Sequence, residues 1–117
     1  MKVGIRRVYE SPGSDEGFRI LVDRVWPRGV RKEELQYDYW AKELAPTPEL
    51  RKWFGHSPER WVGFQERYLA ELKTPEAQER LAAVAKLAGG RRITLLYGAR
   101  DTEHNQAVVL ADVFRKR

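Results

Sequence analysis

Three segments of the chain have the hydrophobic pattern of β-strands. Residues 3–9 alternate apolar and polar side chains and are rich in residues that favour strands. Residues 18–25 and 91–99 instead have continuous apolar centres, which are typical of strands buried on both faces, as in a parallel sheet covered by helices. The pattern therefore predicts three strands, of which two lie in the interior of a sheet.

Helical patterns occupy most of the remaining chain. Residues 47–54, 57–73 and 74–90 begin with Thr-Pro, Ser-Pro and Thr-Pro, which combine a capping hydroxyl with proline in the first turn. Their apolar residues recur at helical spacing, so each segment has one face to bury. A last helix is predicted toward the C-terminus, with Asp101 or Thr102 as its N-cap.

The order of these elements predicts the fold class. Strand, loop, strand, several helices, strand and helix is an α/β pattern. We expect residues 1–117 to form one layered domain, a small and mostly parallel sheet flanked by helices. A length of 117 residues fits a single domain.

Composition and charge narrow the function classes. The absence of cysteine excludes disulfides, thiolate metal ligands and cysteine nucleophiles. No apolar stretch approaches the roughly 20 residues needed to cross a bilayer, and residues 1–10 do not resemble a signal peptide, so we expect a cytoplasmic protein without a membrane partner. The formal charge of +5 favours anionic partners. An arginine-rich surface that only keeps the protein soluble explains the same charge.

Charged and aromatic residues follow two of the predicted strands. In open α/β sheets, ligands bind beyond the carboxyl ends of the strands, where helix N-termini also present free N–H groups. If residues 18–25 and 91–99 form parallel neighbours, the groups that follow them share one edge of the sheet. Those groups are Asp23, Arg24, Trp26 and Arg28 after the first strand, and Tyr97, Arg100, Asp101, His104 and Asn105 at the second.

The residue types at this edge favour an anionic ligand. Arginine binds phosphate or carboxylate through paired N–H groups, and a helix N-terminus adds partial positive charge. A carboxylate can act as a base, and an imidazole can donate a proton. The ligand-binding candidates are Arg24, Trp26, Arg28, Tyr97, Arg100 and Asn105. The catalytic candidates are Asp23, Asp101 and His104.

A purely structural role is the alternative for the same residues. Asp23 can pair with Arg28 or Arg100 only to hold a loop, Asp101 can be an N-cap, and His104 can be a surface residue. Charged groups at strand ends are often structural ion pairs, and such pairs need not be catalytic.

Three motifs carry a resemblance to a known family. The stretches VDRVWPRG, WAKELAPTPELRKWFGHSPERW and LLYGARDTEHNQAVVL resemble the YeaO-like branch of the domain of unknown function 488 family. The resemblance implies a compact α/β domain and brings no established activity. The longer branch of that family has a cysteine at the end of the late strand and a Cys-His-Arg run at the next helix start. Here Tyr97 and residues 105–107 occupy those places, so thiolate chemistry is excluded.

Metal and cofactor sites are weakly indicated. The chain has two histidines, His56 and His104, and they are not at a paired ligand spacing. A Mg²⁺ ion held by Asp23 and Asp101 is a weaker alternative. No glycine-rich phosphate loop is present, so we expect neither a metal nor a cofactor. For His56, a turn residue bonded to the backbone is favoured over a place at the edge of the site.

The sequence therefore predicts a protein that binds a small anionic ligand, with transformation of that ligand left open. Nucleic-acid binding through the basic surface is the first alternative, and it predicts an affinity that falls steeply with salt. A protein-interaction module is the second. The ligand's identity, the reaction and the oligomeric state do not follow from the sequence.

Overall fold

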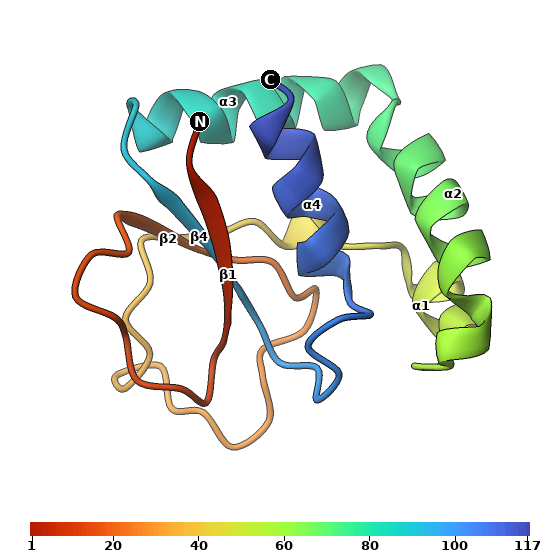
Figure 1. The fold of residues 1–117 in the computed structure, drawn as a ribbon, viewed down its shortest axis with the longest axis horizontal. Coiled ribbons are helices and arrows are strands. Elements are labelled where there is room, and N and C mark those ends of the chain that lie inside the picture. Colours follow the sequence, from red (N-terminus) through yellow and green to blue (C-terminus); the bar gives the residue numbers. More distant parts are fainter.

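The computed structural model describes all of residues 1–117 and contains one four-stranded sheet (Figure 1). The strand order is β1-β4-β2-β3, and every neighbouring pair is parallel. The predicted α/β fold with a small sheet flanked by helices is confirmed. The strands are β1 (Val3–Arg7), β2 (Phe18–Leu21), β3 (Tyr39–Trp40) and β4 (Ile93–Tyr97).

Four α-helices and two short 3₁₀ helices complete the chain. Figure 1 shows α4 beside β1, with both termini at the same end of the molecule, where the Arg115 guanidinium donates to the carbonyl of Val3. None of the helices is long and apolar enough to cross a membrane. The helices are η1 (Lys42–Leu44), α1 (Pro48–Phe54), η2 (Pro58–Arg60), α2 (Trp61–Leu72), α3 (Pro75–Ala88) and α4 (Gln106–Arg115).

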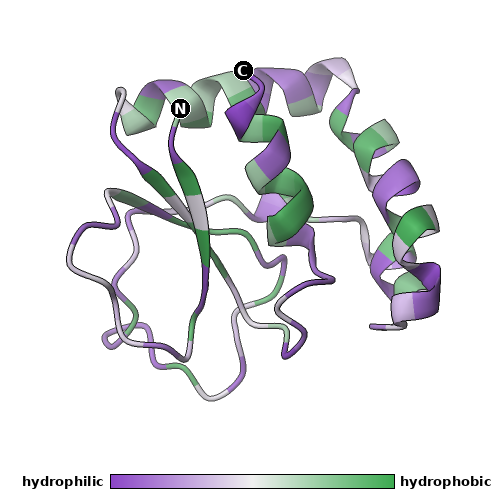
Figure 2. Ribbon diagram, in the orientation of Figure 1, coloured by the Kyte–Doolittle hydropathy of each residue, from purple (hydrophilic) through white to green (hydrophobic).

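The two faces of the sheet are covered differently. Ile20 and Leu95 lie on the face that packs against the helices, in the larger of two hydrophobic clusters. Leu21 and Leu96 lie on the other face, in a smaller cluster under the loops that precede β2 and β3. Figure 2 shows these loops as mostly hydrophilic, in contrast to the central strands. The prediction of burial on both faces is right, but helices cover only one face, because the β1–β2 and β2–β3 connections contain no α-helix.

Two of the predicted helix starts are confirmed in atomic detail. The Thr47 hydroxyl accepts from the N–H of Leu50 at 3.2 Å, and the Thr74 hydroxyl accepts from the N–H of Ala77 at 3.3 Å. Ser57 makes no such bond, because the chain first forms η2 and enters α2 only afterwards.

The predicted start of the last helix is wrong. Asn105, rather than Asp101 or Thr102, is the N-cap, and its Oδ1 accepts from the N–H of Val108 at 3.2 Å. The helix α4 therefore begins at Gln106, and the preceding polar residues form a separate turn.

A buried ion cluster lies on the loop-covered face of the sheet. Glu16 contacts the guanidinium groups of Arg6 and Arg19, and Glu16 and Arg19 are both less than one-tenth exposed. Burial by itself raises the pKa of Glu16, but the N–H of Gly13 and the two guanidinium groups outweigh burial, so its pKa lies below the ordinary value. The long loop before β2 is therefore held by charge as well as by apolar contact.

Helices α1 and α2 approach each other closely at a glycine, Gly63. The Trp53 indole lies against Gly63, where an added Cβ would be 2.8 Å from the ring. The guanidinium of Arg67 lies 3.9 Å from the centre of the same ring, which places a cation over the indole. Gly63 thus permits an approach that no larger residue allows.

We predict that Gly63→Ala destabilises the protein by about 1 kcal/mol. The higher helix propensity of alanine stabilises a helix by about 1 kcal/mol relative to glycine, but the clash of its Cβ with Trp53 costs about 1–3 kcal/mol. In a Trp53→Leu background the clash is absent, so the same substitution is expected to stabilise the protein. Urea unfolding of the wild type, both single variants and the double variant measures the coupling. Equal gains in stability from alanine in both backgrounds would contradict this contact.

Candidate functional site

The carboxyl ends of β2 and β4 emerge side by side, as the predicted site requires. The two strands are parallel neighbours, with Leu21 paired to Leu96. A cavity of about 610 Å³ opens beyond them. We call it the strand-end cavity, and six of the nine predicted site residues line it. These six are Asp23, Arg24, Trp26, Arg28, His104 and Asn105.

The other three predicted residues do not line the strand-end cavity. Tyr97 is 2% exposed and lies in the helix-side core, where burial raises the pKa of its hydroxyl, so it does not form the wall that we expected. Arg100 is exposed at the end of the sheet. Asp101 does not line the cavity but contacts the ring of His104, which does.

Asp23 joins the three segments that meet at this end of the sheet. Its Oδ2 accepts from the N–H of Gly98 at 2.9 Å, and its Oδ1 accepts from Nε2 of Gln106 at 2.5 Å. The first bond reaches the segment after β4, and the second reaches the first residue of α4. A Cβ at Gly98 would lie 2.8 Å from Oδ2, so the approach needs glycine. The predicted ion pair with Arg28 or Arg100 does not occur.

Burial raises the pKa of Asp23 from its ordinary value of 3.8 to about 6. The N–H of Gly98, the amide of Gln106 and the charge of Arg51 favour the carboxylate but do not cancel the effect of burial. Such a pKa suits a general base. Both carboxylate oxygens already accept hydrogen bonds, however, so the geometry makes Asp23 a positioning residue.

Arg24 and Trp26 are held by backbone carbonyls. The Arg24 guanidinium donates to the carbonyl oxygens of Pro46 and Ala45, each at 3.0 Å, and so fixes the chain that leads into α1. The Trp26 Nε1 donates to the carbonyl of Val30 at 2.6 Å, and the indole packs on the loop-covered cluster. Both side chains also line the strand-end cavity, so they support its walls through these bonds to the backbone.

His104 is oriented by Asp101. Its Nδ1 lies 2.9 Å from Oδ2 of Asp101, and its ring stands edge-on to Trp61 with the ring centres 5.2 Å apart. The Asp101 Oδ1 accepts from the N–H groups of Glu103 and His104. The N–H of Glu103 and the imidazole together hold the pKa of Asp101 below its ordinary value. Nδ1 of His104 is thus occupied by Asp101, whereas Nε2 has no hydrogen-bond partner within the chain.

Four further polar residues line the strand-end cavity that the sequence did not place there. Arg51 and Lys52 come from α1, His56 follows that helix, and Gln106 begins α4. In the sequence, the only indication of these residues was the pair of adjacent basic residues just before the helix end at Gly55. No local pattern predicted that α1 ends beside the sheet. The four residues come from segments that only the tertiary fold brings together.

His56 has an unusual backbone conformation. Its φ of 57° is the left-handed value that non-glycine residues adopt at a cost of roughly 1–2 kcal/mol. It is exposed, lines the strand-end cavity and makes no side-chain bond to the backbone, contrary to the role that the sequence favoured. The structure places it at the edge of the site instead.

The charges of the strand-end cavity are unbalanced. Its lining includes four cationic side chains but only one carboxylate, that of Asp23. Arg28, Arg51 and Lys52 are exposed and make no ion pair. The N-terminus of α4 lies at this cavity, which Asn105 and Gln106 line, and so does the C-terminus of α1, at Phe54, so the two helix dipoles there have opposite signs. No group of three or more histidine, cysteine, aspartate or glutamate side chains is placed to hold a metal ion.

Comparisons with known proteins connect the chain to one family. The family model DUF488-N3i, described as the inactive DUF488-N3 subclade, matches residues 2–117. The uncharacterised protein YeaO of Escherichia coli is 46% identical over 116 residues, which are 98% of this chain and 98% of that protein. The uncharacterised protein Rv3073c of Mycobacterium tuberculosis is 40% identical over 116 residues, or 99% of this chain and 96% of that protein. No solved structure gives a significant match.

We predict that Asp23→Asn stabilises the protein at pH 8. Because the folded-state pKa of Asp23 is raised to about 6, the folded state loses stability as the pH rises from about 4 to 6 and does not regain it above that range. Asparagine stays neutral, and the Gln106 amide can turn to accept from it. Unfolding by urea is expected to show a gain on the order of 2 kcal/mol at pH 8 and little gain near pH 4.

The control for this prediction is Asp15→Asn, because Asp15 is exposed and makes no ion pair. This control should change stability little at either pH. An Asp23→Asn variant that is no more stable than the wild type at pH 8 would show that the carboxylate is not disfavoured by burial.

Proposed function

The chain belongs to the DUF488-N3i family, the inactive DUF488-N3 subclade, and on that premise we propose that it binds a small phosphate- or carboxylate-bearing ligand without transforming it. The ligand would occupy the strand-end cavity. The description of the subclade as inactive favours binding over catalysis, and so does the absence of cysteine.

The observation that carries the proposal is the group of unpaired cations in the cavity. Arg28, Arg51 and Lys52 line one cavity, and none of them makes an ion pair with its single carboxylate, Asp23. Like charges held close together repel one another, and the repulsion grows where water is displaced. An anion between them would remove this repulsion and would accept their hydrogen bonds.

The side chains divide into ligand-binding and framework groups. Arg28 and Arg51 can each offer paired N–H donors to an oxyanion, and Lys52 adds a compact charge. Asp23 and Arg24 hold the segments around them through the bonds described above. The residues that would bind the ligand are thus different from those that hold the surrounding segments together. The ligand-binding residues can therefore be replaced without loss of the fold.

The lining does not favour a covalent reaction. It contains no cysteine, serine or threonine, so thiol and aliphatic hydroxyl nucleophiles are missing. Both oxygens of Asp23 accept hydrogen bonds, and Nδ1 of His104 is held by Asp101. These groups fit the positioning of a ligand better than the turnover of one.

The proposal predicts that a paired substitution in the cavity weakens anion binding at least tenfold. The variant is Arg28→Gln with Arg51→Gln, and its matched control is Lys86→Gln with Arg117→Gln, two exposed cations outside the cavity. Hydrogen bonds to charged groups contribute about 1.5–3 kcal/mol each, so the loss of two is readily measured. Calorimetric titration with sulfate, phosphate and citrate at constant ionic strength gives the affinities, and the control should stay within twofold of wild type.

Two outcomes would overturn the proposal. Equal losses in the cavity variant and in the control would mean that the overall charge, not a site, attracts the anion. No binding of any of the three anions, together with oligonucleotide binding that weakens steeply with salt, would instead support the nucleic-acid alternative.

A further inference from the structure

The strand-end cavity has an apolar side next to its cations. Tyr9 and Val25 both line it and are 49% and 60% exposed, which places them among the most exposed large apolar residues of the chain. Pro27 also lines the cavity but is itself buried. A bare oxyanion would contact the cations and leave these apolar side chains in water.

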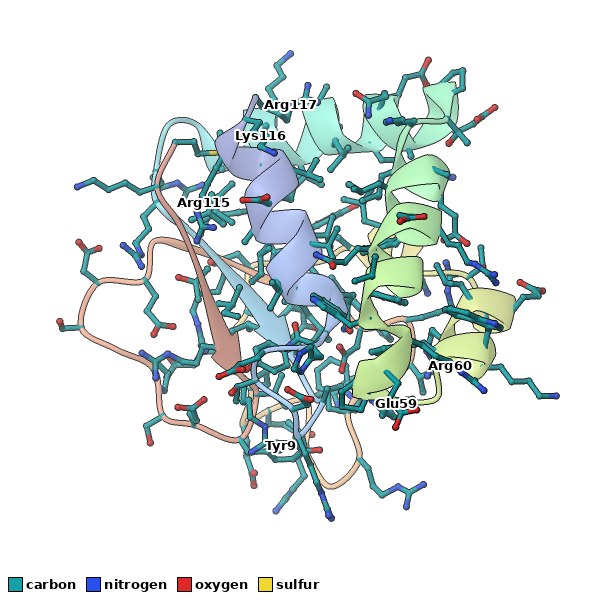
Figure 3. The ribbon with its side chains drawn as sticks, turned by 45° about the vertical axis from the view of Figure 1, so that its right-hand side comes forward. Tyr9, Glu59, Arg60, Arg115, Lys116 and Arg117 are labelled. Atoms are coloured by element: carbon teal, nitrogen blue, oxygen red, sulfur yellow. The ribbon has the colours of Figure 1, made fainter.

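Tyr9 is fixed in position beside Arg28. Its hydroxyl donates to the carbonyl of Arg28 at 2.8 Å, and the guanidinium of Arg7 lies 4.9 Å from the centre of its ring. Arg7 is itself anchored, since its Nε donates to the carbonyl of Ala99 at 2.9 Å. Figure 3 shows Tyr9 beyond the carboxyl ends of the strands, at the opposite end of the molecule from Arg115. The Tyr9 ring is therefore held beside Arg28 by a hydrogen bond at its hydroxyl and by the guanidinium of Arg7.

The cavity is also larger than a simple anion needs. A volume of about 610 Å³ lies within the range of about 300–1,000 Å³ typical of sites for whole organic molecules. An inorganic phosphate would fill a small part of it. Tyr9 and Val25 line the same cavity, so a larger ligand could contact them.

Building on the proposed function, we infer that the ligand carries an aromatic ring next to its anionic group. The anion would lie among Arg28, Arg51 and Lys52, and the ring would rest on Tyr9 and Val25. Flat rings pack favourably on a tyrosine ring, and burial of the apolar contact adds to the affinity. Aryl phosphates, aryl carboxylates and nucleoside 5′-monophosphates share this chemistry.

The test compares ligands that differ in the ring but keep the anion. The pairs are phenyl phosphate with glycerol 3-phosphate, phenylacetate with acetate, and adenosine 5′-monophosphate with ribose 5-phosphate. Calorimetric titration of the full chain is expected to show about tenfold tighter binding of the ring-bearing member in at least one pair. The pair that shows the preference identifies the source of the ring.

Variants then test whether Tyr9 and Val25 cause the preference for ring-bearing ligands. Tyr9→Ser and Val25→Ser should each reduce it at least threefold, whereas Tyr39→Ser, at an exposed tyrosine outside the cavity, should leave it unchanged. Tyr9→Phe keeps the ring but loses the bond to Arg28, so it should retain the preference even if the affinity for both members of a pair falls.

The outcomes separate this inference from the proposed function. Equal affinities within all three pairs, with binding still dependent on Arg28 and Arg51, would overturn the inference and leave the anion site intact. A ring preference that persists in both Tyr9→Ser and Val25→Ser would also overturn it. Failure of every anion to bind would overturn the proposed function itself.

Discussion

The end of the molecule that holds the candidate site depends on the hydrogen bonds of one buried carboxylate. Asp23 leaves β2, accepts from the N–H of Gly98 after β4, and accepts from Gln106 at the start of α4. These bonds join the end of β2 to the segment after β4 and to the start of α4. The same burial raises the pKa of Asp23 to about 6, so its charged form costs stability near neutral pH. The arrangement of the strand-end cavity is maintained against this cost.

Local patterns predicted much of the fold because its elements are specified by neighbouring residues. Thr47 and Thr74 cap their helices as their sequence contexts indicate, and the continuous apolar run of β4 is buried on both faces. The prediction failed where several residues could make the same bond. Asp101 and Asn105 can each accept N–H groups at a helix start, and the choice depends on where the chain turns back over the sheet. The two-residue strand β3 is too short to give a pattern.

The candidate site divides in the same way. Residues that directly follow β2 and β4 could be placed at one edge of the sheet, because parallel neighbours end together. Arg51, Lys52 and His56 could not, since they come from α1 and the turn after it. Contacts distant in sequence hold that helix beside the cavity, among them the bonds from the Arg24 guanidinium to the carbonyls that precede α1 and the packing of Leu50 and Phe54 in the core. This part of the cavity lining follows from tertiary packing and not from a motif.

Two charged clusters in this small protein differ in how their charges are balanced. On the loop-covered face, Arg6 and Arg19 contact Glu16, and Arg6 also lies 3.8 Å from Glu10, so each cation has an acidic partner. That cluster has a structural role, because its ion pairs fix the loop before β2. In the strand-end cavity, Arg28, Arg51 and Lys52 make no ion pair, although Arg51 and Lys52 lie in the last turn of α1, where a positive charge favours the helix. Cations that outnumber the carboxylates of their cavity are the arrangement that a bound anion would complete.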